Sequence, residues 1–255
     1  MLNILVNWAR YDSWRGKLLR LPLNLLPKKT IVTVVSGKSR GKKWIVGSAD
    51  HGAWLGTYES EKQFAFSRFV RQGMVVYDIG AHVGVYTILA STLVGVEGRV
   101  IAFEPLPHNL FYLHKHLKIN SVNNVSVIET ALSDKSSLST FAVGQTSSMG
   151  RLDSSGSLTV QSFTLDEIIH LHKLPIPEII KMDIEGGEAD ALKGAAQLLS
   201  KTSPIIFLAT HGEAVREECR TFLASLAYDM DALIGDTTGT EFIAQRRSSA
   251  RSTIT

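Results

Sequence analysis

Three carboxylates stand close together after an apolar segment in the second half of the chain. The sequence EIIKMDIEGGE at residues 178–188 places Asp183, Glu185 and Glu188 within six residues. Carboxylates at the end of a buried strand are costly unless a partner or a ligand compensates them. Ligands of open α/β sheets bind at the carboxyl edge of the strands, so we expect Asp183 to face a bound ligand or its reaction partner. Glu188 has a simpler alternative, because an acid there also suits the N-terminus of a following helix.

A histidine follows the next apolar segment. The sequence PIIFLAT at residues 204–210 leads into His211, which would lie beside the end of the segment that carries Asp183. Histidine titrates near neutral pH, so we expect His211 to act as a general base toward a hydroxyl, with Glu185 orienting it or the acceptor. A core histidine with a structural role is the alternative. In a second arrangement, Asp183, Glu185 and His211 would hold Mg²⁺ or Mn²⁺, which would polarise the hydroxyl.

A glycine-containing turn follows the first apolar segment of the main domain. Residues 74–79 read MVVYDI and continue as GAHVG, so Asp78, Gly80 and Gly84 frame a turn between a strand and a helix. Glycine lets the backbone turn sharply and approach a ligand closely, and the start of a helix offers unpaired N–H groups. His82 stands where a dinucleotide site has its middle glycine. We expect His82 to touch a bound cofactor through its backbone.

An acid at the end of the next strand indicates a nucleoside. Glu104 lies 24 residues after Gly80, in the sequence FEP at residues 103–105. A carboxylate at this place accepts both hydroxyls of an adenosine ribose in dinucleotide-binding folds. Asp78 suits a cationic ligand, and S-adenosylmethionine carries an ammonium and a sulfonium but no phosphate. The residues therefore favour S-adenosylmethionine over NAD. An NAD-linked oxidoreductase and a non-catalytic nucleotide-binding module are the alternatives.

The elements that must position these residues alternate between strand and helix. The strand-like segments are rich in Val and Ile and almost continuously apolar, as is typical of strands covered on both faces. They lie at 74–79, 99–104, 125–130, 178–183 and 204–210, and the helical segments lie at 84–94, 107–119, 188–200 and 213–226. Two last strands, at 228–234 and 241–246, are expected to pair antiparallel. This order predicts an α/β domain with a mostly parallel sheet.

An extension precedes this domain. Segments 31–35 and 43–47 flank a glycine-containing loop and predict a β-hairpin. Ser60 can cap a helix over residues 61–71, and His51 falls in a predicted loop before it. We therefore divide the chain into an N-terminal extension, a main domain and a flexible basic tail, at residues 1–73, 74–246 and 247–255.

Two further segments of the main domain are read from their local patterns. Thr164 opens a capping box for a helix that ends near His172. His116 belongs to the helical segment at 107–119, whose histidines we expect at the surface. The Ser- and Gly-rich stretch at 133–157, with SSM at 147–149, has no readable pattern. We expect this stretch and the N-terminal extension to build the pocket of the acceptor.

Composition and charge limit the classes of function. Of the 255 residues, 44% are hydrophobic, and the single cysteine, Cys219, excludes an intramolecular disulfide or a cysteine zinc site. No apolar run approaches the ~18–20 residues of a membrane span, and no signal peptide is evident, so we expect a cytoplasmic protein. Residues 1–43 carry a net charge of +9, residues 44–245 carry −9 and residues 246–255 carry +3. An acidic body predicts no nucleic-acid partner. The basic ends could touch the inner face of an anionic membrane, but solubility is the favoured interpretation.

Five short motifs together carry a resemblance to a known family. They are WLGTYE at 54–59, DIGAHVG at 78–84, FEP at 103–105, TLD at 164–166 and KMDIEG at 181–186. The chain resembles the FkbM-type S-adenosylmethionine-dependent methyltransferases over residues 31 to 234, and the last motif is the most specific part. His82 is a departure, because the family usually has asparagine there.

The resemblance implies a fold and a set of contacts. It implies a class I methyltransferase, Rossmann-like sheet of seven strands with an antiparallel C-terminal strand. It also implies O-methylation of a sugar, a glycan or a secondary metabolite that has a free hydroxyl. The extension would cover the cofactor, with Tyr58 and Glu59 near its methionine end. The implied contacts are Asp78, Gly80, His82 and Gly84 for the methionine half, Glu104 and Pro105 for the ribose, Ala131 and Leu132 for the adenine, and Asp183 for the ammonium or the acceptor.

Overall fold

The computed structural model describes residues 23, 25–143, 150–152, 158–233, 236 and 238–247. The leucine-rich basic segment within residues 1–22, the residues at 147–149 and the tail at 248–255 lie outside the described residues. No helix in these ranges is long and apolar enough to cross a lipid bilayer.

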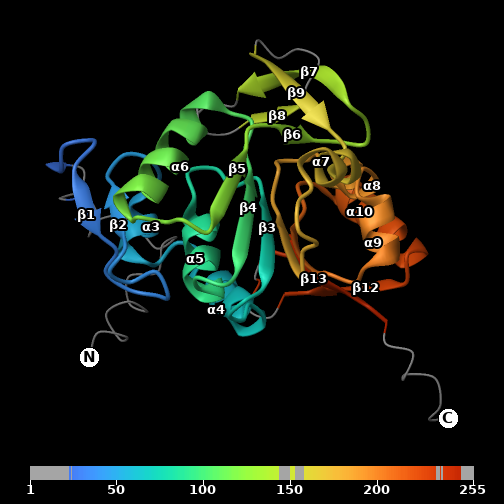
Figure 1. Cartoon of the computed structure of the whole chain (residues 1–255), viewed down its shortest axis with the longest axis horizontal. Helices are drawn as coiled ribbons and strands as arrows, with labels where there is room; N and C mark the ends of the chain where they lie inside the picture. The colour runs from blue at the N-terminus through green and yellow to red at the C-terminus, as the bar shows by residue number, and fades with distance from the viewer. Residues whose placement is uncertain are drawn as a thin grey trace.

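A seven-stranded sheet forms the centre of the main domain (Figure 1). Its strands are β3 (Val75–Ile79), β4 (Arg99–Phe103), β5 (Val125–Ile128), β10 (Ile179–Met182), β11 (Ile205–Ala209), β12 (Tyr228–Ala232) and β13 (Glu241–Arg246). They lie in the order β12-β13-β11-β10-β3-β4-β5. Strand β13 is antiparallel to both of its neighbours, and the pairs from β11 to β5 are parallel. The predicted α/β fold, with a mostly parallel seven-stranded sheet and an antiparallel strand near the C-terminus, is confirmed.

Helices cover both faces of this sheet (Figure 1). One face packs against α4 (Ser60–Phe69), α5 (Val85–Val94) and α6 (Pro107–Ile119), and the other against α7 (Leu165–His172), α8 (Glu188–Lys193), α9 (Ala196–Lys201) and α10 (Glu213–Ser225). Alternate residues of each strand serve the two faces: Val100 and Ala102 face the first helices, and Ile101 and Phe103 face the second. This two-sided burial explains the continuous apolar runs of the strands.

The register of the central strands brings the predicted site residues to one edge. The chain leaves β3 toward β4 and β5 on one side, and it returns to β10 and β11 on the other. Lys181 of β10 lies opposite Asp78 of β3, and Asp78 lies opposite Ala102 of β4. Residues that follow these strands therefore meet at the switch point, where open α/β sheets bind ligands.

A second, small sheet occupies part of the stretch at 133–157 that had no readable pattern, and it extends to residues on both sides of it. It contains β6 (Ala131–Leu132), β7 (Ser137–Val143), β8 (Gly150–Leu152) and β9 (Leu158–Phe163), in the order β6-β9-β7-β8. Sequence reasoning assigned no element to this stretch, and the structure places β7 and β8 in it. The alternation of apolar and polar residues that marks a strand is concealed here by serines at paired positions. The Ser137 and Ser162 hydroxyls lie 3.1 Å apart as a cross-strand pair. Since β6 follows β5 almost at once, this sheet rises from the carboxyl edge of the central sheet (Figure 1).

The predicted helix at 188–200 is two helices. Helix α8 ends before Gly194, and α9 begins at Ala196. The Asp166 carboxylate accepts the backbone N–H groups of Gln197 and Leu198, and so supplies a cap for the second helix. A Cβ at Gly194 would lie 2.0 Å from the Ser133 carbonyl oxygen, so the break also lets the chain pass close to its neighbour. Thr164 caps α7 as predicted, by accepting the Glu167 N–H.

The extension packs on the main domain through a buried histidine. Strands β1 (Ile31–Thr33) and β2 (Lys43–Ile45) form the predicted hairpin. The His116 ring is fully buried and stacks on Trp44 at 3.8 Å, so the expectation of a surface position is wrong. Its Nε2 accepts the Ile45 N–H, and its Nδ1 lies 2.8 Å from the Val83 carbonyl oxygen. Burial lowers the pKa of His116 to about 4, so the ring is neutral.

Two local expectations for the extension also fail. His51 lies in a short helix, α3 (His51–Leu55), and its Nδ1 accepts the Trp54 indole N–H. Asp50 caps that helix by accepting the Gly52 N–H, which explains why the chain turns helical there. Ser60 is the first residue of α4 and not its cap. The cap position belongs to Glu59, whose backbone is left-handed and whose side chain is used elsewhere.

Candidate active site

A cavity of about 330 Å³ lies at the carboxyl ends of β3, β4 and β10. That volume is in the range of small-molecule sites. The extension closes one side of it with Asp50, Ala53 and Tyr58. The expected contacts that line it are Gly80, His82, Glu104, Pro105, Ala131, Leu132, Asp183 and Glu185. Asp78, Gly84 and His211 are not among the lining residues.

The glycine turn forms one wall of the cavity. Gly80 has a φ of +80°, and a Cβ there would lie 1.9 Å from the Asp183 carbonyl oxygen. Gly84 has a φ of +100°, and a Cβ there would lie 2.7 Å from Leu113. Both glycines are therefore required by the close approach of neighbouring segments. Gly84 serves the packing of the turn on α6 and does not line the cavity.

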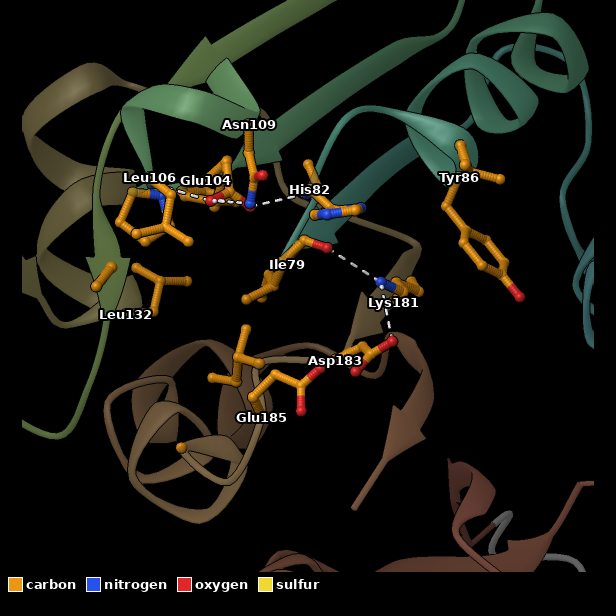
Figure 2. A pocket seen from close by; sticks show the side chains of 18 of the residues that line it. Ile79, His82, Tyr86, Glu104, Leu106, Asn109, Leu132, Lys181, Asp183 and Glu185 are labelled. Carbon is orange, nitrogen blue, oxygen red and sulfur yellow. Dashed lines mark hydrogen bonds and ion pairs between the residues drawn. The ribbon is translucent and has the colours of Figure 1, made fainter. Parts of the chain in front are cut away.

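Glu104 forms one end of the cavity (Figure 2). The residue is 4% exposed and accepts three N–H groups: His82 at 2.8 Å, Leu106 at 2.9 Å and the Asn109 amide at 3.1 Å. Burial raises the pKa of Glu104, and the three donors counteract that rise. A carboxylate has about four acceptor positions, so one position remains for a hydroxyl of a ligand. The side chain of Leu132 adds an apolar wall beside this end.

Asp78 already has a cationic partner inside the protein. Its carboxylate is 1% exposed, accepts the Thr87 hydroxyl at 2.6 Å and lies 3.6 Å from the Lys181 ammonium. Its position therefore differs from the expectation that Asp78 itself meets a cationic ligand. The chain folds this way because the register of β3 and β10 places the two residues opposite each other.

Lys181 links the buried acid to the cavity, and sequence reasoning missed it. Its ammonium donates to the Gly80 carbonyl at 3.2 Å and lies 3.7 Å from the Asp183 carboxylate (Figure 2). Burial would lower the pKa of Lys181, but the Asp183 and Asp78 carboxylates raise it above its usual value. The side chain is therefore charged at neutral pH. A lysine inside an apolar strand was the available signal.

Asp183, Glu185 and His211 meet at the rim of the cavity. The His211 Nε2 lies 3.6 Å from the Asp183 carboxylate and 3.5 Å from the Glu185 carboxylate. The side chains are partly exposed: 35% for His211, 28% for Asp183 and 39% for Glu185. One ligand atom of each lies within 4.8 Å of the others, so the three could hold a metal ion. Two of the three side chains line the cavity, and His211 contacts them from outside it.

Glu188, and not Glu185, holds the histidine ring. Its side chain is fully buried, and one carboxylate oxygen lies 2.9 Å from the His211 Nδ1. The same oxygen accepts the N–H groups of Ile184 and Gly186, both at 3.1 Å. The hydrogen bond to Glu188 is the main cause that raises the pKa of His211 to about 9. The sequence did not predict this role of Glu188, since an acid at the start of a helix is already explained by its favourable interaction with the helix N-terminus.

Tyr58 and Glu59 have different places. Tyr58 lines the cavity, as the position near a cofactor requires. Glu59 does not line it, and instead accepts the Tyr86 hydroxyl at 3.0 Å and the Lys62 ammonium at 3.1 Å. Lys62 in turn donates to Glu241 of β13 at 2.7 Å. This network holds α4 of the extension against α5 and the edge of the central sheet.

Comparisons with known proteins place this site in a family. Residues 78–235 match the family model described as the methyltransferase FkbM domain. Over 134 residues the chain is 27% identical to the hexuronic acid methyltransferase AglP of Haloferax volcanii. That match covers 52% of this chain and 54% of AglP, so the chain matches about half the length of that relative.

Two solved structures have a similar fold. The methyltransferase FkbM from Methylobacillus flagellatus KT has a TM-score of 0.52 at 19% identity, covering 77% of this chain and 55% of that one. The precorrin-6y C5,15-methyltransferase from Geobacter metallireducens GS-15 has a TM-score of 0.52 at 18% identity, covering 79% and 94%. These likenesses support the class I methyltransferase fold. Because the FkbM model matches more than half of the chain, this protein belongs to the FkbM family of S-adenosylmethionine-dependent methyltransferases.

Proposed function

We propose that this protein transfers a methyl group from S-adenosylmethionine to a hydroxyl of a sugar or glycan. The observation that supports it is one cavity with two different ends (Figure 2). Glu104 offers one remaining acceptor position at the first end. At the second end, the carboxylates of Asp183 and Glu185 reach the His211 imidazole. The first end therefore has a group that can bind a nucleoside, and the second end has groups that can bind a hydroxyl acceptor.

The residues present fit the methyl donor. Glu104 would accept one ribose hydroxyl at its remaining acceptor position, and Ala131 and Leu132 would flank the adenine. The turn at Gly80 and His82, together with Asp183, would hold the methionine part. When bound, S-adenosylmethionine supplies a methyl group on a sulfonium: the new O–C bond forms as the C–S bond breaks, which leaves S-adenosylhomocysteine. Alignment of the reacting atoms can contribute ~7–11 kcal/mol at the upper end.

The acceptor hydroxyl must lose its proton, and His211 is the residue proposed to take it. General-base catalysis is worth ~10²–10⁴ in rate. With a pKa of about 9, the imidazole is protonated at neutral pH. As a base, His211 must first lose that proton, so methyl transfer should become faster as the pH rises toward about 9. Glu185, which lines the cavity, would accept a hydrogen bond from the acceptor and so orient it.

The relative and the extension both support a sugar as the proposed acceptor. AglP is named as a hexuronic acid methyltransferase, and here Asp50 and Tyr58 bring polar groups to the cavity. These groups can bind hydroxyls of a sugar ring. A hydroxyl of a secondary metabolite is the second class of acceptor.

The test is methyl transfer by the purified full chain. Labelled S-adenosylmethionine would be incubated with hexuronic acid glycosides, neutral glycosides and phenolic metabolites. We expect S-adenosylhomocysteine and a glycoside whose mass has risen by one methylene unit. Binding of S-adenosylmethionine without turnover on any acceptor would instead support a non-catalytic module.

A further inference from the structure

We propose that Asp183, Glu185 and His211 form a binding site for a divalent cation at the rim of the cavity. In this site Glu188 is a positioning residue that turns the histidine toward the cation. The inference rests on the proposed function for its purpose, which is to activate the acceptor hydroxyl. Binding of the cation itself can be measured without any methyl transfer.

The three ligand atoms come from neighbouring strands of the sheet. Asp183 follows β10, and His211 follows β11, which pairs with β10 in parallel register. The His211 Nε2 lies 3.6 Å from one carboxylate and 3.5 Å from the other. Ligands on one octahedral ion at ~2.1 Å stand about 3 Å apart. A shift of about half an ångström would bring the Nε2 to that spacing from each carboxylate, and the ligand atoms of all three residues already lie within 4.8 Å of one another.

The histidine is held as a metal ligand usually is. Histidines that bind metals donate their other ring N–H to a carboxylate or carbonyl, which fixes the tautomer and the ring orientation. Here the Nδ1 faces the fully buried Glu188 at 2.9 Å. Glu188 cannot swing away easily, because it also accepts the N–H groups of Ile184 and Gly186. The Nε2 atom is thereby directed toward Asp183 and Glu185, and it would bind a cation once it has lost its proton.

The local charge is negative even with His211 protonated. Ion pairs join four carboxylates, those of Asp78, Asp183, Glu185 and Glu188, to only two cationic side chains, Lys181 and His211. An acceptor that is a hexuronic acid carries a further negative charge. Like charges in one cleft repel each other strongly where water is displaced. A divalent cation would offset that repulsion and could contact the acceptor directly.

The ligand set favours Mn²⁺ over Mg²⁺. Mg²⁺ is bound almost entirely by oxygen, whereas first-row transition ions also accept imidazole nitrogen. The partial exposure of the three side chains leaves room for water or a hydroxyl to complete the coordination. A cation there would lower the pKa of the hydroxyl. With a cation bound, His211 would be a ligand, a role that replaces the general-base role proposed above, and the hydroxyl proton would leave to water.

The experiment measures Mn²⁺ binding to the full chain after chelator treatment, by electron paramagnetic resonance of free Mn²⁺, without acceptor. We expect one Mn²⁺ for each chain, bound more tightly than Mg²⁺. Asp183→Asn and His211→Ala should each weaken binding by tenfold or more, and Glu188→Gln by ~10–100-fold. The controls Asp190→Asn and Glu213→Gln, both exposed acids near the site, should change it less than twofold.

Two outcomes would overturn the cation site. One is wild-type binding no tighter than that of His211→Ala, which would reduce the cluster to an ordinary acidic surface. The other is equal binding by wild type and Glu188→Gln. Binding of S-adenosylmethionine and the circular dichroism spectrum check that each variant is folded, and His211→Asn replaces His211→Ala if the latter is not. Mn²⁺ binding without methyl transfer would overturn only the proposed function. Transfer that survives chelation, with no Mn²⁺ bound, would overturn only the cation site.

Discussion

The two ends of the cavity are built by different means. At the first end, Glu104 is buried and held mostly by backbone N–H groups. At the second end, Asp183, Glu185 and His211 are partly exposed and their charges do not balance. Backbone partners come with the fold itself, so the first end suits a ligand that a whole class of enzymes shares. Unbalanced side chains at the second end suit the chemistry and the acceptor of one enzyme.

The largest effect on cofactor binding and stability is expected at Gly80, which approaches the backbone of Asp183. Gly80→Ala would place a Cβ 1.9 Å from the Asp183 carbonyl oxygen, at a φ of +80°. We expect loss of detectable S-adenosylmethionine binding by calorimetry. The loss of stability should exceed the ~1–3 kcal/mol that backbone strain alone costs. Gly73→Ala is the matched control, since Gly73 has a φ of +81° and nothing within 4 Å of a built Cβ. Equal destabilisation of the two variants would contradict the steric argument.

Lys181 joins the buried acid to the second end, so its removal should affect stability as well as binding. Lys181→Met leaves Asp78 buried without its cation, and breaking a buried ion pair costs ~3–5 kcal/mol. Urea unfolding measures this loss. Lys193→Met removes an exposed lysine that pairs with Asp190 and Glu218, and it should cost at most about 1 kcal/mol. A Lys181→Met variant as stable as Lys193→Met would show that the Lys181 pair does not support the fold.

A pair of substitutions separates the two ends kinetically. His211→Ala should lower kcat by ~10²–10⁴ and leave the KM for S-adenosylmethionine nearly unchanged. Glu104→Gln should raise the KM for S-adenosylmethionine and leave kcat nearly unchanged. The new amide nitrogen would face one of the N–H groups that now donate to the carboxylate. A hydrogen bond to a charged group is worth ~1.5–3 kcal/mol, so the KM should rise by roughly ten- to a hundredfold. If both variants changed the same constant, the two ends would not have separate roles.

The smallest expected effect concerns pH. The pKa of His211 is raised to about 9 in the folded protein, above the ~6.5 of an unfolded chain. Its contribution to stability is therefore complete below pH ~6.5 and is lost as the pH rises through about 9. Glu188→Gln should move the pKa of His211, followed by NMR, down toward its ordinary value. The difference in Tm between wild type and this variant should narrow over the same pH range. An unchanged pKa would assign the shift to another group.

The sequence was enough to predict much of the fold and the first end of the site. Apolar runs identified the central strands, and Gly80 and Glu104, whose spacing predicted a nucleoside site, line one cavity; their role toward a nucleoside stays a prediction. Roles that depend on register or on tertiary distance could not be read. The partnership of Lys181 with Asp78 follows from the pairing of β10 with β3, and that of Glu188 with His211 joins residues 23 positions apart.

Other errors had a signal that was available but weak. His116 follows Leu113 by three residues and precedes Leu117, so helical periodicity already placed it on the buried face. The strands β7 and β9 were hidden because Ser137 and Ser162 give a polar composition to a paired sheet. Composition describes average polarity, whereas pairing depends on which residues face each other.

The central claim is that Glu104 binds the nucleoside of the methyl donor, and that the cluster of Asp183, Glu185 and His211 binds the acceptor of the same reaction. A crystal structure of the full chain with S-adenosylhomocysteine tests it most directly. The account predicts a ribose hydroxyl within hydrogen-bond distance of the Glu104 carboxylate, and the sulfur turned toward Asp183 and His211. A nucleoside bound elsewhere, or bound here with its sulfur directed away from that cluster, would contradict it.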